Sequence, residues 1–113
     1  MLSGKLGTMY CMQKHNVNSR PDFFAVLDTA RQTQTAVMTL QPGQESGEKG
    51  NEHAQSDEVL YVISGELEAE IGSETATLHA GDVVIVPAGA PHRFRNGGES
   101  PAQTLNVYAP PAY

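Results

Sequence analysis

Short segments of alternating apolar and polar residues, separated by glycine, proline, asparagine and aspartate, fill the chain from residue 22 onward. The clearest is "ELEAEI", in which Leu67, Ala69 and Ile71 alternate with three glutamates. Successive side chains on a strand point to opposite faces, so this segment is typical of a strand with one buried and one solvated face. No segment has the periodicity of a long amphipathic helix. The pattern predicts eight short strands: "DFFAVLD", "TQTAVMTLQ", "EVLYVIS", "ELEAEI", "TATLHA", "DVVIVPA", "HRFRN" and "QTLNVYA".

Eight short strands at even spacing predict an all-β fold, an antiparallel sandwich or small barrel. Two of the strands, "EVLYVIS" and "DVVIVPA", are apolar on both faces. Such strands lie in the middle of a sandwich or beneath another subunit. In a chain this small the second arrangement carries weight, so we expect a homodimer that covers one sheet.

The chain of 113 residues is the length of one domain. Residues 1–20 are polar and without pattern, and they are predicted to form a flexible N-terminal arm. Residues 21–113 are predicted to form a single barrel domain. The last residues, "YAPPAY", are predicted to be a terminal cover segment, because prolines exclude a helix or a central strand there.

Composition narrows the classes of function. The net charge is −6, with 7 basic and 13 acidic residues, and the only local basic pair is Arg93 and Arg95. Binding of a phosphate backbone needs a positive surface, so no nucleic-acid partner is expected. No segment approaches the roughly 18 consecutive apolar residues of a membrane span, and the N-terminus lacks the pattern of a secretory signal. With a single cysteine, Cys11, no intramolecular disulfide can form, and a cytoplasmic protein with no membrane partner is predicted.

Two segments carry the candidate chemistry. The second along the chain is "GDVVIVPAGAPHRFRN", residues 81–96, and the first is "GNEHAQSDEVLYVISGE", residues 50–66. The second segment resembles the second motif of the cupin superfamily at every defined position: Gly81, Pro87, Gly89, His92 and Asn96. The first resembles the first cupin motif, a histidine pair one residue apart followed by a glutamate and a glycine. Here its four positions are occupied by Asn51, His53, Glu58 and Gly65.

The resemblance covers residues 36–108 and implies a double-stranded β-helix, or jelly-roll barrel, of antiparallel strands. By alternation Asn51 shares a face with His53, and His92 shares a face with Phe94 and Asn96. The resemblance implies that these rows and the row that begins at Glu58 face one barrel interior. Two imidazoles and one carboxylate with open positions suit a divalent transition metal such as Fe, Mn, Ni or Zn.

The predicted metal-binding residues are therefore His53, Glu58, His92 and Asn51, and Glu58 is also the predicted catalytic residue. Asn51 stands where the cupin motif has its first histidine. Its carbonyl could bind the ion as a weaker, neutral donor, or it could hydrogen-bond a metal-bound water or the substrate. A barrel without metal stays open as an alternative.

Three side chains are predicted to line a substrate pocket: Phe94, Leu60 and Met38. Leu40 and Leu105 are expected to face the same interior. Mostly apolar walls suit a small polar or partly apolar molecule. Two functions remain open. One is a metal-dependent enzyme, with oxygenase chemistry as the first choice and decarboxylase or isomerase chemistry behind it. The other is a non-catalytic module that binds or senses a small molecule, with or without metal.

Overall fold

The computed structural model describes residues 10–50 and 53–113, and they form an almost entirely β structure. A single 3₁₀ turn, η1 (Val17–Ser19), precedes the strands. The eight strands are β2 (Phe24–Thr29), β3 (Gln34–Leu40), β4 (Asp57–Ser64), β5 (Glu66–Ile71), β6 (Glu74–His79), β7 (Val83–Val86), β8 (His92–Arg95) and β9 (Ala102–Ala109). All eight predicted strands are confirmed, with bounds that differ by no more than two residues.

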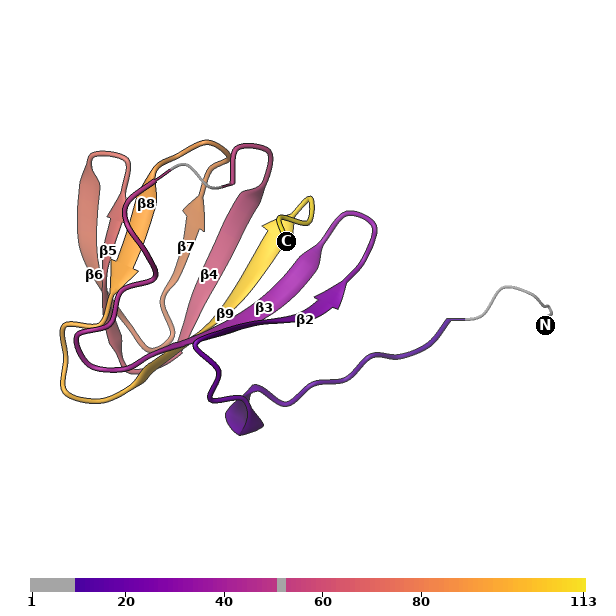
Figure 1. The fold of residues 1–113 in the computed structure, drawn as a ribbon, viewed down its shortest axis with the longest axis horizontal. Coiled ribbons are helices and arrows are strands. Elements are labelled where there is room, and N and C mark those ends of the chain that lie inside the picture. The colour runs from indigo at the N-terminus through magenta and orange to yellow at the C-terminus, as the bar shows by residue number, and fades with distance from the viewer. Residues whose placement is uncertain (1–9, 51–52) are drawn as a thin grey trace.

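The strands form two antiparallel sheets that face each other (Figure 1). The larger has the order β2-β3-β9-β4-β7, and the smaller has the order β6-β5-β8. Strands distant in sequence are neighbours, as where the last strand, β9, lies between β3 and β4. This crossing of strands between two sheets is a jelly-roll barrel, so the predicted fold class is confirmed.

The space between the sheets is apolar toward one end and polar toward the other. Along the inner face of the larger sheet, Leu40 lies opposite Ala102. Thr104 lies between Met38 on one side and Val62 on the other. Nearer the other end, Tyr108 lies between Gln34 and Glu58. The hydrophobic core consists mainly of Met38, Leu40, Leu60, Val62, Leu67, Leu78, Val86 and Phe94. This core fills the apolar end of the barrel and packs beneath the polar end.

The outer face of the smaller sheet is polar, as the pattern of "ELEAEI" predicts. Arg93 on β8 pairs with Glu70 on β5 at 3.1 Å, and Arg95 pairs with Glu68 at the same distance. Both arginines therefore point away from the interior, which leaves His92 and Phe94 of the same strand facing inward.

The N-terminal arm is anchored to the outer face of the larger sheet at its last turn. The side-chain amide of Gln103 donates hydrogen bonds to the main-chain oxygens of Val17 at 2.9 Å and Arg20 at 3.0 Å. Before η1, His15 of the arm pairs with Asp28 on β2 at 3.0 Å, and the described residues that precede it run away from the barrel (Figure 1). Among residues 10–50 and 53–113 there is no helix long and apolar enough to cross a membrane.

Candidate metal centre

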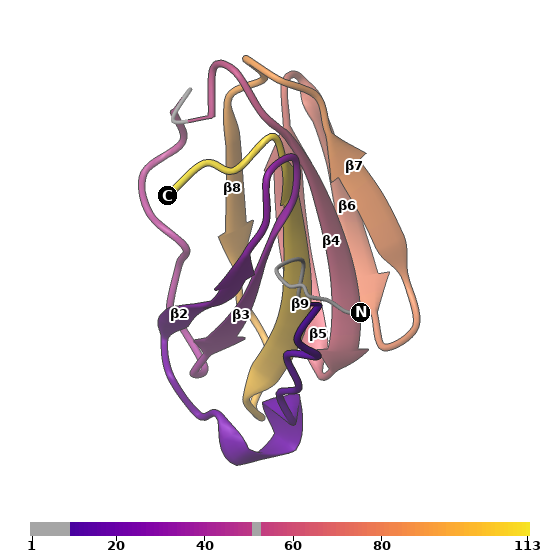
Figure 2. The same ribbon diagram turned by 90° about the vertical axis from the view of Figure 1, so that its right-hand side faces the viewer.

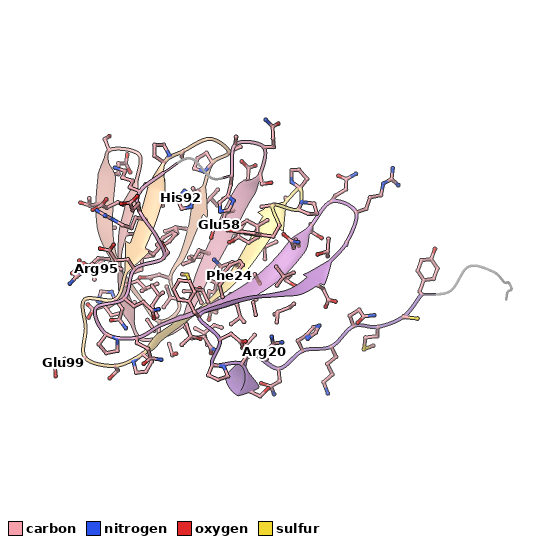
Figure 3. The ribbon with its side chains drawn as sticks, viewed as in Figure 1. Arg20, Phe24, Glu58, His92, Arg95 and Glu99 are labelled. Atoms are coloured by element: carbon pink, nitrogen blue, oxygen red, sulfur yellow. The ribbon has the colours of Figure 1, made fainter. Side chains whose placement is uncertain are left out.

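Three of the predicted site residues meet at the polar end of the barrel. His53 lies in the loop before β4, Glu58 is the second residue of β4, and His92 is the first residue of β8. Their ligand atoms all lie within 4.8 Å of one another. Figure 3 shows Glu58 and His92 near each other at the same end of the barrel, from strands of the two different sheets.

Glu58 Oε1 is the atom on which both imidazoles converge. His92 Nε2 lies 3.5 Å from it and His53 Nε2 lies 4.0 Å from it. The two imidazole rings stack with their centroids 5.3 Å apart. All three side chains are at least nine-tenths buried. The arrangement places two nitrogen donors and one oxygen donor around a common point that is shielded from water.

The loop before β8 fixes the orientation of the His92 ring. His92 Nδ1 lies 2.9 Å from the main-chain oxygen of Ala90, which can only accept a hydrogen bond. Nδ1 therefore carries a proton, and in the neutral ring the lone pair is on Nε2, which faces Glu58. Metal-binding histidines are commonly held by an outer hydrogen bond of this kind.

The other carboxylate oxygen, Glu58 Oε2, is held by side chains of β9. Asn106 Nδ2 donates a hydrogen bond to it at 2.7 Å, and the Tyr108 hydroxyl lies 3.4 Å away. Thr104 in turn donates to Asn106 Oδ1 at 2.7 Å, which fixes the amide so that its NH₂ group faces Glu58. Burial and the nearby charge of Glu58 both raise the pKa of Tyr108, so this phenol stays protonated.

Glu58 Oε1, in contrast, is buried and has no hydrogen-bond partner among the described residues. A buried acceptor left without a partner costs roughly 1–3 kcal/mol, and more when it is charged. Burial raises the pKa of Glu58, although the Asn106 hydrogen bond and the nearby His92 oppose this effect. A cation between Oε1 and the two Nε2 atoms would remove the penalty. The donor set therefore fits a divalent transition metal.

The predicted pocket residues divide into two groups. Met38 and Phe94 line a small cavity beside the three candidate ligands. Leu60 lies in the hydrophobic core and is not among the residues that line this cavity, so its role in a substrate pocket stays a prediction. Two residues along a strand span about 7 Å, so Leu60, the next side chain after Glu58 on the inner face of β4, already lies in the core beneath the cavity. Asn51 lies outside the described residues.

Seven residues that line this cavity were not predicted from the sequence, and they include Asn106, Tyr108 and Tyr113. The expectation that Leu105 faces inward is wrong, since Thr104, Asn106 and Tyr108 of β9 are buried on the inner face and Leu105 is on the outer face. The signal available in the sequence was that Thr104, Asn106 and Tyr108 alternate along β9 and therefore lie on the same face of the strand.

Comparison with known proteins agrees with this fold. The family model described as the cupin domain matches residues 36–108, which include every strand from β4 to β8 and most of β3 and β9. The TT1209 protein from Thermus thermophilus has a similar structure, with a TM-score of 0.76 and 33% identity over 88% of this chain and 98% of that one.

Two further relatives have more specific descriptions. The polyketide synthase CurC of Streptomyces cyaneus is 34% identical over 71 residues, 63% of this chain and 45% of that protein. A predicted oxalate decarboxylase from Thermotoga maritima has a TM-score of 0.68 and 25% identity, over 76% of this chain and 77% of that one. The chain spans about half the length of the first two curated relatives it matches.

Proposed function

The chain belongs to the cupin family, and we propose that it binds a divalent transition-metal ion through His53, Glu58 and His92 and acts as a metal-dependent enzyme on a small molecule. The observation that carries this proposal is the buried Glu58 Oε1, which has no hydrogen-bond partner among the described residues and is faced by two imidazole nitrogens at 3.5 and 4.0 Å. When bound, such an ion polarises an oxygen atom of its substrate.

The residues around the site would each have a defined task. Asn106 and Tyr108 hold Glu58 Oε2, so that Oε1 stays directed at the ion. Phe94 and Met38 form an apolar wall that excludes water from the reacting atoms. Glu58, as the predicted catalytic residue, contributes the single negative charge among the three ligands.

The substrate class follows from the size of the cavity and the chemistry of the relatives. The cavity has a volume of about 50 Å³, far below the roughly 300–1,000 Å³ of sites for drug-sized ligands. A carboxylate or carbonyl oxygen on a small molecule fits this space beside an ion. Oxalate and polyketides, named in the descriptions of two relatives, both carry such oxygens. Oxygenase and decarboxylase chemistry are both consistent with the proposal.

A second candidate is a non-catalytic module that binds a small molecule in the same cavity. Turnover of a substrate distinguishes the enzyme from the binding module. Oxygen consumption with catechols, diketones and thiols, and CO₂ release from small dicarboxylates, would be measured with the metal-loaded protein. Turnover that His92→Ala abolishes supports the enzyme, whereas binding of such molecules with no turnover of any of them supports the module.

Metal content is the direct test of the site. Purified protein should carry close to one transition-metal ion per chain by elemental analysis, and His53→Ala and His92→Ala should each abolish it. Binding should also weaken below about pH 6, because a ligating imidazole must be neutral.

The matched control is His79→Ala. His79 lies on β6 with its side chain 67% exposed and paired with Glu66, so its removal should leave the metal content unchanged. Metal content that stays the same in both His53→Ala and His92→Ala would rule the site out.

We also propose that the protein is a homodimer, through the outer face of the larger sheet. A cytoplasmic location stays a prediction.

A further inference from the structure

The last residues of the chain turn back over the polar end of the barrel. β9 ends at Ala109, and the following residues leave the strand beside the β2–β3 hairpin (Figure 2). Gln34, buried at the start of β3, holds this tail. Its Oε1 accepts hydrogen bonds from the main-chain N–H groups of Ala112 at 3.0 Å and Tyr113 at 2.9 Å. Its Nε2 donates to the main-chain oxygen of Tyr113 at 2.9 Å.

This anchoring places the Tyr113 ring among aromatic groups of the site. Its centroid lies 4.8 Å from that of Phe24, 5.2 Å from that of Tyr108 and 5.3 Å from that of His53. Contacts with three rings fix the direction of the side chain. Tyr113 thus lines the same cavity as the three candidate ligands.

The hydroxyl of Tyr113 is directed at the nitrogen that would bind the ion. It lies 3.3 Å from His53 Nε2, and the same nitrogen faces Glu58 Oε1. Donors at metal distances of about 2.0–2.2 Å are separated from one another by about 3.0–3.5 Å in octahedral or tetrahedral geometry. The separation of the Tyr113 oxygen from His53 Nε2 falls in this range, as does the 3.5 Å between His92 Nε2 and Glu58 Oε1, while the 4.0 Å between His53 Nε2 and Glu58 Oε1 lies above it.

An independent reason for a further donor lies in the first cupin motif. That motif has two histidines, and in this chain Asn51 occupies the first of the two positions. The centre therefore has one imidazole fewer than the motif provides, while the tail brings a phenol oxygen to the neighbouring imidazole.

We propose that Tyr113 is the fourth donor of the metal centre and binds the ion through its phenol oxygen beside His53 Nε2. The proposal rests on the metal site of the proposed function and extends it. Binding breaks the O–H bond, and the proton leaves to water, which reaches the residue because Tyr113 is 59% exposed. The resulting donor set of two nitrogens and two anionic oxygens can also hold Fe(III), the oxidised form of one of the candidate ions, and Fe(III) reports a bound phenolate oxygen by its colour.

The test loads the full-length protein with Fe(III) and records the visible absorption spectrum. Phenolate bound to Fe(III) gives an intense charge-transfer band in the visible region, which imidazole and carboxylate ligands do not give. Wild-type protein should show the band. Tyr113→Phe should keep its fold, because it preserves the ring contacts, and should lose the band while its affinity for the metal falls by about tenfold or more.

Two matched variants identify the tyrosine. Tyr61→Phe removes a hydroxyl from the opposite face of the sheet, and Tyr108→Phe removes one that contacts Glu58 Oε2. Both should retain the band. Loss of the band in Tyr108→Phe but not in Tyr113→Phe would assign the donor to Tyr108 and overturn the proposal.

The outcomes also separate this inference from the proposed function. Wild-type protein that binds one Fe(III) without a charge-transfer band retains the metal site but excludes Tyr113 as a ligand. Protein that binds neither Fe(III) nor any divalent transition ion overturns both.

Discussion

The two carboxylate oxygens of Glu58 have opposite environments, and this difference links stability to function at a single residue. Oε2 is held by Asn106 and Tyr108, whereas Oε1 is buried without a hydrogen-bond partner in the described structure. Burial raises the pKa of Glu58, so the metal-free folded state holds a proton here more tightly than the unfolded chain does. The metal-free protein should therefore lose stability as the pH rises from the ordinary glutamate pKa of about 4.3 through the raised value.

Glu58→Gln should remove this cost. The neutral amide keeps an acceptor for Asn106 and needs no counter-ion, so we expect the free energy of unfolding of the metal-free protein to rise by about 1 kcal/mol at neutral pH. The gain should shrink toward pH 4, where wild-type Glu58 is itself protonated. Urea unfolding at several pH values in the presence of a chelator measures both effects.

The control for this prediction is Glu66→Gln, which changes an exposed glutamate on β5 and should leave the pH dependence in place. Metal binding should be lost in Glu58→Gln only. A Glu58→Gln protein that is less stable than wild type at neutral pH would show that the charge of Glu58 does not destabilise the metal-free fold.

At the level of strands and loops, period-two alternation was enough to locate every strand but not to assign both faces of each. β5 has one apolar and one charged face, so its orientation follows from the sequence. In β9 the apolar Leu105 suggested the inward row, but the interior there is polar because it surrounds Glu58, and Asn106 takes that position. Hydrophobicity assigns a core face and fails where the interior is a site.

The convergence of His53, Glu58 and His92 was predictable because the motif spacing resembles that of a known family. The position of Tyr113 at the cavity was not, because it depends on Gln34, 79 residues away in sequence. No local pattern contains that contact. Long-range hydrogen bonds of the tail are visible only in the folded structure.

The turn between β4 and β5 supplies a prediction at the same scale. Gly65 has a φ of +82°, and a Cβ atom there would lie 2.6 Å from the main-chain oxygen of Pro101 and 2.7 Å from Ala102 Cα. Both contacts are to backbone, which cannot move aside easily. Gly65→Ala should therefore lower the free energy of unfolding by roughly 2–4 kcal/mol, through the sum of the positive φ and the overlap.

Gly72→Ala is the matched comparison, because Gly72 also has a positive φ, +60°, but a Cβ atom added there would meet no other atom within 4 Å. It should cost roughly 1 kcal/mol, from the backbone conformation alone. Thermal and denaturant unfolding of the two variants measure the difference. Equal losses would mean that the approach of Pro101 is not what requires glycine at residue 65.

For the molecule as a whole, the outer face of the larger sheet is the surface that remains to be covered. Two rows cross it: Val37, Leu105, Tyr61 and Val83 in one, and Thr35, Val107, Val59 and Ile85 in the other. The anchored end of the N-terminal arm lies over the neighbouring side of this face, at Gln103 on β9. Toward β4 and β7 the face stays open, with Tyr61 42%, Val83 59% and Ile85 61% exposed.

These exposed residues belong to the two strands that the sequence marks as apolar on both faces. A contiguous apolar sheet face of this kind is the usual composition of an interface core. A second copy of the chain presents the same face, so a two-fold pairing buries both at once. A stable dimer of standard size buries about 800 Å² per partner.

Val83→Lys tests the homodimer. A lysine at the open end of the first row would place two charges in the paired face, and we expect the dissociation constant to rise by at least about tenfold, or roughly 1.4 kcal/mol. Sedimentation velocity should then show a dimer for wild type and a monomer for the variant at the same concentration.

The controls for this variant separate a lost interface from a lost fold. Thr77→Lys, on the exposed strand β6 of the smaller sheet, should remain dimeric. Because Val83 points away from Glu58, the metal content of Val83→Lys should equal that of wild type. A wild-type protein that sediments as a monomer at about 100 μM, well above the dissociation constants of about 1 μM typical of such interfaces, would leave the apolar face without this explanation.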